Sequence, residues 1–500
     1  MHKMRNLFTP VQKRLDPWPF QAESINDIIS YRNSYSGKQL AGVLVAPTGT
    51  GKSLIIAHSV YQLAEPVLVI QPSVELLEQN YEKYINHGGV ASIYSASAGA
   101  KHLSSCTFAT PGSIVGKGEL FRRILKVKVL FIDECHYKVK TEKDKGKEDE
   151  WGQVMEFIND MQPEVIIGLT ATPIRLNTSN MGPTLNMIIR TKHKLFHDII
   201  KVIQIQDIYD KYWKKLNYKM YDFDESLLKL NSSGTEFQEE SIKLSVAHNN
   251  INRKISIDIR EMINNGTKSI LVFMDTVDNT KKLSDWLNSI GIKSASIDGK
   301  TAKNTRKKYV SEFKTGEISV LINYGTFTTG FDHPGLECVM MGRPTNSFPM
   351  LYQIIGRLVR IHPEIKEGLF IDYCNNIKRL GYINNITFEN FPGYGWGMFS
   401  KQEINGKTRE RLMSGRPLNM EPLYKEDLAI RAAEKVKGPY TLVHFGKWKG
   451  HPMKEVPTSY LHYCVETFKQ PDGILMEKFM DQVFEELENR KEKLLGINLN

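Results

Sequence analysis

The fold is decided by the stretch Ala46-Pro47-Thr48-Gly49-Thr50-Gly51-Lys52-Ser53, which lies between an apolar run at 40–45 and a helical pattern at 54–63. A strand, a glycine-rich turn and a helix in this order are the context that a phosphate-binding loop requires. Gly49 and Gly51 allow the backbone to curl so that several N–H groups point at one anion. The helix N-terminus adds partial positive charge at the same place. The stretch therefore predicts a site for the phosphates of a nucleotide.

Several side chains of this loop suit a nucleotide that is bound with magnesium. Lys52 can bridge the β- and γ-phosphates, and the Ser53 hydroxyl can ligate Mg²⁺. Thr48 and Thr50 lie in the same turn, and Ala46 occupies the first position of the pattern, where glycine is usual. We expect ATP and Mg²⁺ as the ligands. The alternative is a glycine-rich turn that is followed by Lys-Ser by chance.

The composition is that of a folded chain with a polyanionic partner. The sequence has 500 residues, of which 41% are hydrophobic and 24% are charged, and its net charge is +10. This length suggests roughly two to four domains, and the positive charge favours a polyanion. The five scattered cysteines argue against a disulfide framework or a zinc site and are typical of a reducing cytoplasm. We expect no membrane span, since no apolar run approaches about 18 residues, and no signal peptide, since residues 1–10 are too polar.

Short β-like runs alternate with helical stretches in the first half of the chain. The runs are 42–46, 67–71, 127–133 and 165–170. Alternation of this kind predicts a parallel sheet with helices on both faces. In such sheets ligands bind beyond the carboxyl ends of the strands, and every motif described here lies at such an end.

Two further motifs follow strands of this sheet. The sequence D-E-C-H begins at Asp133, and an apolar strand that delivers two adjacent acids is unusual unless something binds them. Asp133 can hold Mg²⁺, Glu134 can orient and deprotonate an attacking water, and His136 can link this loop to neighbouring polar groups. Thr170 and Thr172 follow the last run and could relay the nucleotide state to a second domain. The alternatives are a solvated acidic turn and an ordinary turn.

A second α/β domain, without a phosphate loop of its own, is predicted after about residue 250. Its β-like runs are 269–274, 294–297, 319–323, 338–341 and 369–373. Gln353, Arg357 and Arg360 form the pattern Q-x-x-G-R-x-x-R, and we expect the two arginines to share one helix face. Planar guanidinium groups suit developing phosphoryl charge, so we predict catalytic roles for both. The alternative is a basic, solvated helix face.

In this order, these motifs resemble motifs I, II, III and VI of superfamily 2 helicases. The resemblance implies two tandem RecA-like parallel-sheet domains that hold ATP between them and couple its hydrolysis to domain closure. Gln21 resembles the adenine-reading glutamine, with Trp18 and Phe20 in place of the arginine and tyrosine that relatives often have. Gly330 and Asp332 belong to a stretch that resembles motif V, which implies that they contact the nucleotide.

The same resemblance implies contacts with strand phosphates, which fix position without reading sequence. The residues implied, from motifs Ia, Ib and V and a strand-binding element after motif IV, are Pro72, Ser73, Thr110, Pro111, Gly112, Gly299 and Thr328. Near the C-terminus, Trp448 stands between two lysines, which suits a phosphate-and-stacking contact. The alternative is that Trp448 forms the core of a small module.

Four stretches narrow the resemblance to bacterial RadD-type helicases and phage branch-migrating, UvsW-like helicases. They are 327–332, 342–345, 352–357 and 370–373. RadD-type proteins carry a C-terminal cysteine cluster, whereas this chain has only Cys464 beyond Cys374. The resemblance implies an ATP-dependent DNA helicase or translocase of replication, recombination or repair. It would unwind or branch-migrate forked DNA in a bacterial or phage-infected cytoplasm.

We predict five segments along the chain. They are a first RecA-like domain (1–201), a connector (202–249), a second RecA-like domain (250–390), a linker (391–437) and a small C-terminal α/β or mostly helical module (438–500). We expect the connector's aromatic residues to pack in a core rather than to stack on bases. Residues 138–150 mix five lysines with five acids and are predicted as a solvated loop.

Three other functions remain open from the sequence. They are an RNA helicase, the motor subunit of a restriction or nuclease assembly, and an ATP-gated binding protein that does not unwind. D-E-C-H in place of D-E-A-D weakens the first, and the intact acid pair and both arginines argue against the last. The expected partners are branched or forked DNA bound without sequence preference, and a single-strand-binding protein or a nuclease.

Overall fold

The structure is a computed structural model that forms two compact units, one of residues 1–386 and 415–419, the other of residues 387–414 and 420–500. The residues it describes are 15–136, 150–179, 182–191, 194–232, 234–325, 331–392, 394–404, 406–415, 421–428, 448, 451, 453–468 and 474–495. The solvated loop predicted at 138–150 therefore lies outside the described residues, except for its last position.

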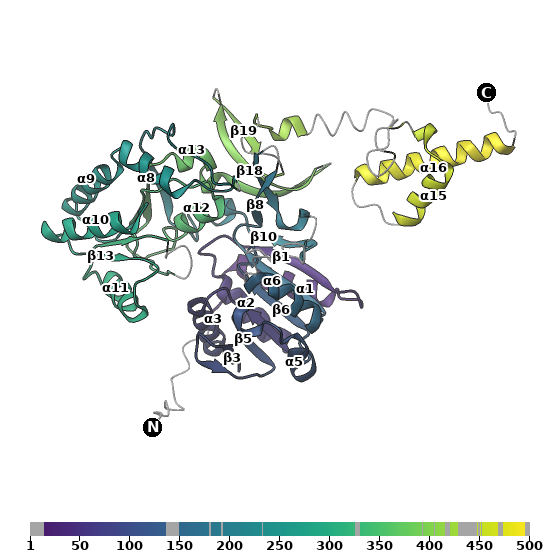
Figure 1. Ribbon diagram of the computed structural model, residues 1–500. Helices are drawn as coiled ribbons and strands as arrows, with labels where there is room; N and C mark the ends of the chain where they lie inside the picture. The colour runs from purple at the N-terminus through teal and green to yellow at the C-terminus, as the bar shows by residue number, and fades with distance from the viewer. Residues whose placement is uncertain are drawn as a thin grey trace. The chain divides into compact units, whose positions relative to one another are not determined.

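The first unit contains an eight-stranded sheet near its N-terminus (Figure 1). In spatial order its strands are β10 (Asp198–Val202), β1 (Leu40–Val45), β7 (Val165–Thr170), β6 (Val129–Asp133), β2 (Val67–Ile70), β5 (Cys106–Ala109), β3 (Ser92–Ser95) and β4 (Ala100–Lys101). All neighbours are parallel except β3 and β4. The central strands are buried along their whole length, which is why they appear in the sequence as continuous apolar runs. The predicted sheet is confirmed.

Helices precede or connect the strands of this sheet along the chain. They are α1 (Pro19–Asn33), α2 (Lys52–Leu63), α3 (Val74–Asn86), α4 (Pro111–Ile114), α5 (Gly118–Leu120) and α6 (Glu150–Met161). A short hairpin of β8 (Ile174–Ser179) and β9 (Gly182–Met187) follows β7. Ser73 caps α3 by accepting a hydrogen bond from the Leu76 N–H at 3.3 Å, as expected of a serine before a helix.

The same unit contains a six-stranded sheet that is parallel throughout. Its strands, in spatial order, are β11 (Lys215–Met220), β16 (Glu367–Asp372), β15 (Cys338–Met341), β12 (Ile270–Phe273), β14 (Val320–Asn323) and β13 (Ser294–Ile297). Its helices are α8 (Glu239–His248), α9 (Ile251–Asn264), α10 (Val277–Ser289), α11 (Lys303–Thr315), α12 (Phe348–Ile355) and α13 (Asn376–Leu380). The second predicted α/β domain is therefore confirmed.

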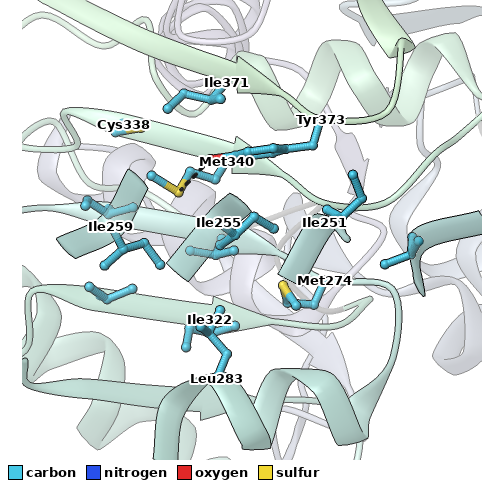
Figure 2. Packing of buried hydrophobic residues seen from close by; sticks show 14 of the residues in the cluster. Ile251, Ile255, Ile259, Met274, Leu283, Ile322, Cys338, Met340, Ile371 and Tyr373 are labelled. Atoms are coloured by element: carbon cyan, nitrogen blue, oxygen red, sulfur yellow. Dashed lines mark hydrogen bonds between the residues drawn. The ribbon is translucent and has the colours of Figure 1, made fainter. Parts of the chain in front are cut away.

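The core of the second sheet follows from the spacing of isoleucines on α9. Ile251, Ile255 and Ile259 recur every fourth position, which places them on one face of the helix. All three are fully buried and pack with strand residues such as Ile322 and Met340 (Figure 2). At about 25 cal/mol per Å² of buried apolar surface, burying one such side chain stabilises the fold by roughly 1.5–3 kcal/mol.

The predicted connector, 202–249, contains regular structure of its own. After α7 (Ile205–Ile208) the chain enters the second sheet as its edge strand β11, and α8 follows. Trp213 and Phe223 are buried, and Tyr221 stacks on Tyr373 with ring centroids 4.9 Å apart. Phe223 and Tyr221 thus pack in the hydrophobic core, as expected, whereas Trp213 is buried outside this cluster.

The second unit contains two small hydrophobic clusters. A three-stranded sheet of β17 (Ile386–Phe391), β18 (Gly395–Ile404) and β19 (Lys407–Leu412) packs around Phe399. Part of the stretch that we expected to be a linker, 391–437, is therefore an antiparallel hairpin. The other cluster joins α15 (Thr458–Thr467) and α16 (Ile474–Leu495) around buried Leu461 and Val483. Among the described residues, no helix is long and apolar enough to cross a membrane.

Candidate active site

The glycines of the phosphate-loop stretch adopt the conformation that the motif requires. Gly49 and Gly51 have φ angles of +84° and +76°, where residues with side chains are strained. A Cβ on Gly51 would lie 2.6 Å from Gln21 Nε2, and a Cβ on Gly49 would lie 3.2 Å from Val359 Cγ2. Both positions therefore need glycine because of backbone conformation and because of crowding.

The rest of the loop is held at the end of β1. The Ala46 N–H donates to the Thr170 carbonyl at 2.9 Å, which extends the pairing of β1 with β7. The alanine at the first position is therefore fully buried. Lys52 Nζ lies 3.4 Å from the Ala46 carbonyl, and Thr50 Oγ1 donates to a loop carbonyl at 2.7 Å. Ser53 follows Lys52 in the first turn of α2.

Gln21 fastens α1 to this loop. Its Nε2 donates to the Thr50 carbonyl at 2.7 Å, and its Oε1 accepts from the Trp18 N–H at 2.8 Å. The side chain is 3% exposed, so both of its polar ends are occupied within the protein. Its role as an adenine reader stays a prediction.

The two acids at the end of β6 have different environments. Asp133 is 3% exposed and accepts from Asn80 Nδ2 at 3.1 Å. Glu134 has a φ of +49°, a left-handed conformation that is rare for a residue with a side chain, and its Oε1 lies 3.3 Å from Lys52 Nζ. Burial and the neighbouring Glu134 raise the pKa of Asp133 to about 6. Burial would also raise the pKa of Glu134, but Lys52 and His136 lower it to about 2.

A chain of polar contacts joins three of the motifs through His136. Its Nδ1 lies 2.8 Å from Thr170 Oγ1 and 3.3 Å from Glu134 Oε2. Its Nε2 lies 3.2 Å from Gln353 Nε2. An amide nitrogen can only donate, so His136 Nε2 accepts this bond and Nδ1 is the ring nitrogen that can donate to Thr170 Oγ1. Thr170 Oγ1 in turn accepts from the Thr172 N–H at 3.0 Å.

The two arginines of Q-x-x-G-R-x-x-R do not share a helix face, so this expectation was wrong. Helix α12 ends at Ile355 with Gly356 as its C-cap, Arg357 lies in the following turn, and Arg360 pairs with Trp213 in an isolated antiparallel bridge. The helix ends where the chain meets the phosphate loop. A Cβ on Gly356 would lie 2.5 Å from Thr48 Cβ.

Consecutive residues of the motif V stretch hold both arginines. Arg357 is 7% exposed and donates from Nη1 to the Phe331 carbonyl at 3.0 Å. Arg360 forms an ion pair with Asp332. Burial lowers the pKa of Arg360 to about 10, which keeps it charged at neutral pH.

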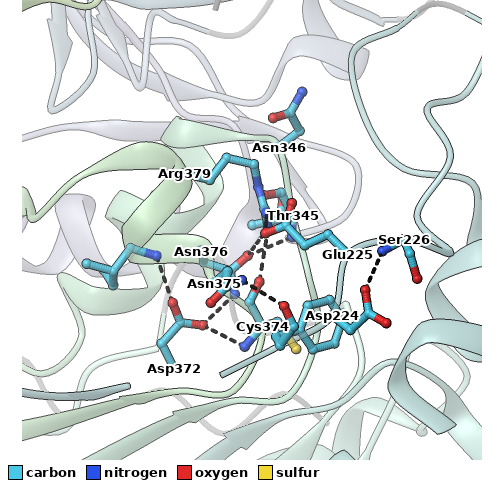
Figure 3. Close-up of polar contacts among 12 residues, drawn as sticks. Asp224, Glu225, Ser226, Thr345, Asn346, Asp372, Cys374, Asn375, Asn376 and Arg379 are labelled. Atoms are coloured by element: carbon cyan, nitrogen blue, oxygen red, sulfur yellow. Dashed lines mark hydrogen bonds and ion pairs between the residues drawn. The ribbon is translucent and has the colours of Figure 1, made fainter. Parts of the chain in front are cut away.

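A polar network joins the end of β16 to the segment that precedes α12 (Figure 3). Asp372, fully buried at the end of β16, accepts from the N–H groups of Cys374 and Ile377 and from Asn376 Nδ2. Asn376 Oδ1 accepts from the Thr345 N–H at 2.8 Å. Thr345 lies two residues before Ser347, whose hydroxyl caps α12.

The structure adds two residues to this region that the sequence did not single out. Asn80 of α3 donates to Asp133. Arg175 Nε donates to the His136 carbonyl at 2.9 Å and its Nη2 to the Cys135 carbonyl at 3.3 Å. The position of Arg175, three residues after Thr172, was the only available signal, whereas Asn80 gave none.

The candidates for nucleic-acid contact in the first sheet lie side by side. Pro72 and Ser73 follow β2, whereas Thr110, Pro111 and Gly112 follow β5, and Ile70 of β2 pairs with Ala109 of β5. The Thr110 hydroxyl is bonded to Ser95 and Ser113 within the protein, whereas Gly112 is exposed. Contact with a nucleic acid at these residues stays a prediction.

The other candidates are scattered. Gly299 follows β13 in an exposed position, and a Cβ there would meet nothing within 4 Å. Thr328 and Gly330 lie outside the described residues. Trp448 belongs to the second unit, where it is partly buried against the α15–α16 cluster, as its alternative interpretation expected. Its contact with nucleic acid is a prediction that nothing here tests.

Two protein families match this chain. Residues 14–175 match the family described as "Type III restriction enzyme, res subunit", and residues 253–362 match "Helicase conserved C-terminal domain". Irc3 of Schizosaccharomyces pombe, named as a mitochondrial ATP-dependent helicase, is 26% identical over 72% of this chain and 58% of its own length. A 51.5 kDa protein of a Lactococcus phage is 24% identical over 67% of this chain and 66% of its own length. The chain thus spans less than two thirds of each relative.

Solved structures show a similar fold. A fragment of an HsdR subunit of a type I restriction enzyme from Vibrio vulnificus matches with a TM-score of 0.54 and 18% identity. The match covers 73% of this chain and 67% of that fragment. Together with the two family matches, this likeness confirms the expectation of two tandem parallel-sheet domains of the RecA-like kind.

Proposed function

Since this protein is a superfamily 2 helicase-type ATPase, we propose that it uses ATP hydrolysis to move along DNA and to unwind or branch-migrate forked structures. The observation that carries the proposal is the line of contacts Lys52–Glu134–His136–Gln353. It begins at the phosphate loop of the first sheet and ends on α12 of the second. A change at the nucleotide can therefore be transmitted between the two domains.

The residues present fit a nucleotide with Mg²⁺. The loop N–H groups and Lys52 would hold the phosphates, and the oxygens of Ser53 and Asp133 are the hard ligands that Mg²⁺ prefers. The Asp133 carboxylate lies buried at the end of the strand beside that loop. Mg²⁺, when bound, would neutralise negative charge on the phosphates.

Glu134 is the side chain best placed to act on water. It is ionised at neutral pH because Lys52 and His136 hold its pKa at about 2 against the effect of burial. In this role it would orient the attacking water and accept its proton. Arg357 and Arg360 would stabilise charge that develops on the phosphoryl group, which for this kind of arginine is worth roughly 10³- to 10⁵-fold in rate.

Motion follows from where these groups are anchored. Arg357 and Arg360 are held by Phe331 and Asp332 of the second domain, whereas Lys52 and Glu134 belong to the first. We propose that the arginines exchange these contacts for the nucleotide during each cycle. Repeated closing and opening of the domains would then shift their grip on a strand.

We infer DNA as the substrate from the name of one matching family. The family that matches the first domain is named after a subunit of a restriction enzyme, which is a class of DNA-acting enzymes. The net charge of +10 suits a polyanion, and the candidate contacts at Ser73 and Gly112 follow neighbouring strands. A motor subunit of a restriction or nuclease assembly is the second candidate, because the HsdR fragment shares the fold.

ATP hydrolysis by the purified protein, measured with a panel of nucleic acids, tests the proposal. The panel contains no nucleic acid, single-stranded DNA, duplex DNA, a four-way DNA junction and matched RNA, each also with Lys52→Ala as the inactive control. We expect the strongest stimulation with the junction. Preference for RNA would overturn the substrate, and no stimulation at all would favour the motor-subunit alternative. Turnover by Lys52→Ala would overturn the assignment of the site.

A further inference from the structure

We propose that Trp213 of the connector contacts the nucleotide, with its indole N–H as a hydrogen-bond donor to a phosphate oxygen on the loop. The inference rests on the nucleotide site proposed above and adds to it a residue that none of the motifs contains. Trp213 lies between the two sheets along the chain, after α7 and before β11.

The first observation is that the indole N–H of Trp213 is a buried hydrogen-bond donor without an acceptor among the described residues. Trp213 is 2% exposed, and its Nε1 has no hydrogen-bond partner among the described residues. A buried tryptophan usually finds a partner for its N–H, and each unsatisfied buried group in a native structure calls for an explanation. A ligand that brings an acceptor to this place would supply one.

The second observation is where this donor lies. A Cβ on Gly49 would be 3.5 Å from Trp213 Nε1, so the indole nitrogen faces the middle of the phosphate loop. The turn there has Gly49 and Gly51 in left-handed conformations, which is typical of loops whose N–H groups surround an anion. The acceptor that such a loop attracts is a phosphate oxygen, and a donor placed beside it would bind the same group.

The third observation is that the neighbours of Trp213 hold it in place. Tyr212 packs on Trp18 and Phe20 with ring centroids 4.8 and 4.9 Å apart. The Lys214 N–H donates to the Val359 carbonyl at 2.8 Å, and the backbone of Trp213 pairs with that of Arg360 in an isolated antiparallel β-bridge.

The Lys214 side chain completes this anchoring. Its Nζ donates to the Pro334 and Leu336 carbonyls at 2.6 and 2.8 Å, at the end of the motif V stretch and directly after it. Of three consecutive connector residues, Tyr212 contacts the segment that contains Gln21, Trp213 lies beside Gly49 of the phosphate loop, and Lys214 contacts the end of the motif V stretch. A hydrogen bond from Trp213 to a phosphate would therefore couple the binding of the nucleotide directly to the connector.

Magnetic resonance of the indole groups tests this inference without relying on turnover. The chain has six tryptophans, which give six indole N–H signals after selective ¹⁵N labelling, and Trp213→Phe identifies the signal of Trp213. We expect this proton to move downfield when ADP or a non-hydrolysable ATP analogue is added with Mg²⁺. Movement with the analogue alone would place the acceptor on the γ-phosphate, and movement with both would place it on the β-phosphate.

A matched pair of variants gives the second measurement. Trp213→Phe keeps the ring and removes the donor, and Trp286→Phe, at a half-exposed site on α10, controls for the loss of a tryptophan. A hydrogen bond to a charged group is worth about tenfold to a hundredfold in affinity. We therefore expect Trp213→Phe to bind the ATP analogue more weakly by that factor and Trp286→Phe to bind it as the wild type does.

The outcomes separate this inference from the proposed function. If the wild type binds nucleotide while its Trp213 signal stays in place, or if folded Trp213→Phe binds with unchanged affinity, the inference is wrong and the nucleotide site stands. If the wild type binds no nucleotide, both are overturned. If Trp213→Phe does not fold, replacing the other five tryptophans in turn identifies the signal in a protein that keeps Trp213.

Discussion

The two parallel sheets of the first unit end in polar side chains, but they use them differently. At the end of the first sheet, Lys52 and Glu134 face each other at 3.3 Å, and His136 continues the line toward the second sheet. At the end of the second sheet, Asp372 accepts three hydrogen bonds from residues that directly follow it. At the first edge, opposite charges lie beside the glycine-rich loop. At the second edge, the aspartate finds its hydrogen-bond donors in the neighbouring residues.

The two sheets share a fold, but the side chains at their edges have different surroundings, so the fold alone does not determine which edge holds a reactive site. Both edges contain a buried aspartate whose pKa is raised by burial. Asp133 neighbours a second acid and a lysine, whereas Asp372 neighbours N–H donors. We therefore expect substitutions at the first edge to change turnover with little effect on folding, and substitutions at the second edge to do the reverse.

Substitutions of Arg357 and Arg360 should have the largest effect on ATP turnover. We propose that these two arginines of the second domain act on the nucleotide held by the first. Arg357→Lys and Arg360→Lys keep the charge but lose the planar, forked donor geometry. We expect ATP turnover to fall by roughly 10³-fold or more, with the melting temperature unchanged. Steady-state hydrolysis with single-stranded DNA measures this, and Arg253→Lys, at an exposed site on α9, is the control. Normal turnover in both variants would remove the arginines from the site.

The next effect concerns Glu134, for which we propose a role in orienting and deprotonating the attacking water. Glu134→Gln preserves shape and removes the proton acceptor, so we expect turnover to fall by about 10²- to 10⁴-fold while nucleotide still binds. Binding of a fluorescent ATP analogue, combined with single-turnover hydrolysis, separates the two. Glu119→Gln, an exposed acid of α5, should change neither. Loss of binding together with turnover would instead make Glu134 a structural partner of Lys52.

A smaller effect is expected where the two edges meet. His136→Ala cuts the link between Glu134, Thr170 and Gln353, and we expect stimulation by DNA to fall about tenfold with a smaller change in basal turnover. Because His136 and Gln353 act through one contact, the double variant with Gln353→Ala should be little worse than either single variant. Additive losses in the double variant would show that the contact does not carry the coupling.

The smallest effect on turnover is expected at the second edge. Asp372→Asn replaces an acceptor oxygen by a donor next to buried N–H groups, which costs about 1–3 kcal/mol in the free energy of unfolding. We expect turnover per folded molecule to change less than about threefold, since the arginines keep their own partners. Urea unfolding and hydrolysis below the transition measure both quantities, with exposed Asp278→Asn as the control. A large loss of turnover with unchanged stability would contradict the comparison.

The apolar runs and the glycine-rich loop predicted two parallel sheets and the positions of the nucleotide motifs, although the edge strand β11 lay in the predicted connector. Buried parallel strands require continuous apolar runs. The boundaries of β1, β6 and β7 lie within two residues of the runs predicted from the sequence. The phosphate loop was equally visible, because its glycines must adopt positive φ wherever such a loop occurs. These features depend on contacts that are local in sequence or on a pattern that every buried strand shares.

How the motifs meet depends on contacts between residues that are far apart in the sequence. The spacing of Arg357 and Arg360 predicted that both lie on one face of a helix. In the structure α12 ends at Ile355, and Gly356 packs against Thr48, which is more than 300 positions away in the sequence. Trp213 likewise gave no sequence signal beyond being aromatic. Its importance comes from a buried N–H that faces Gly49, and such a contact depends on the packing of two domains, which no short stretch of sequence encodes.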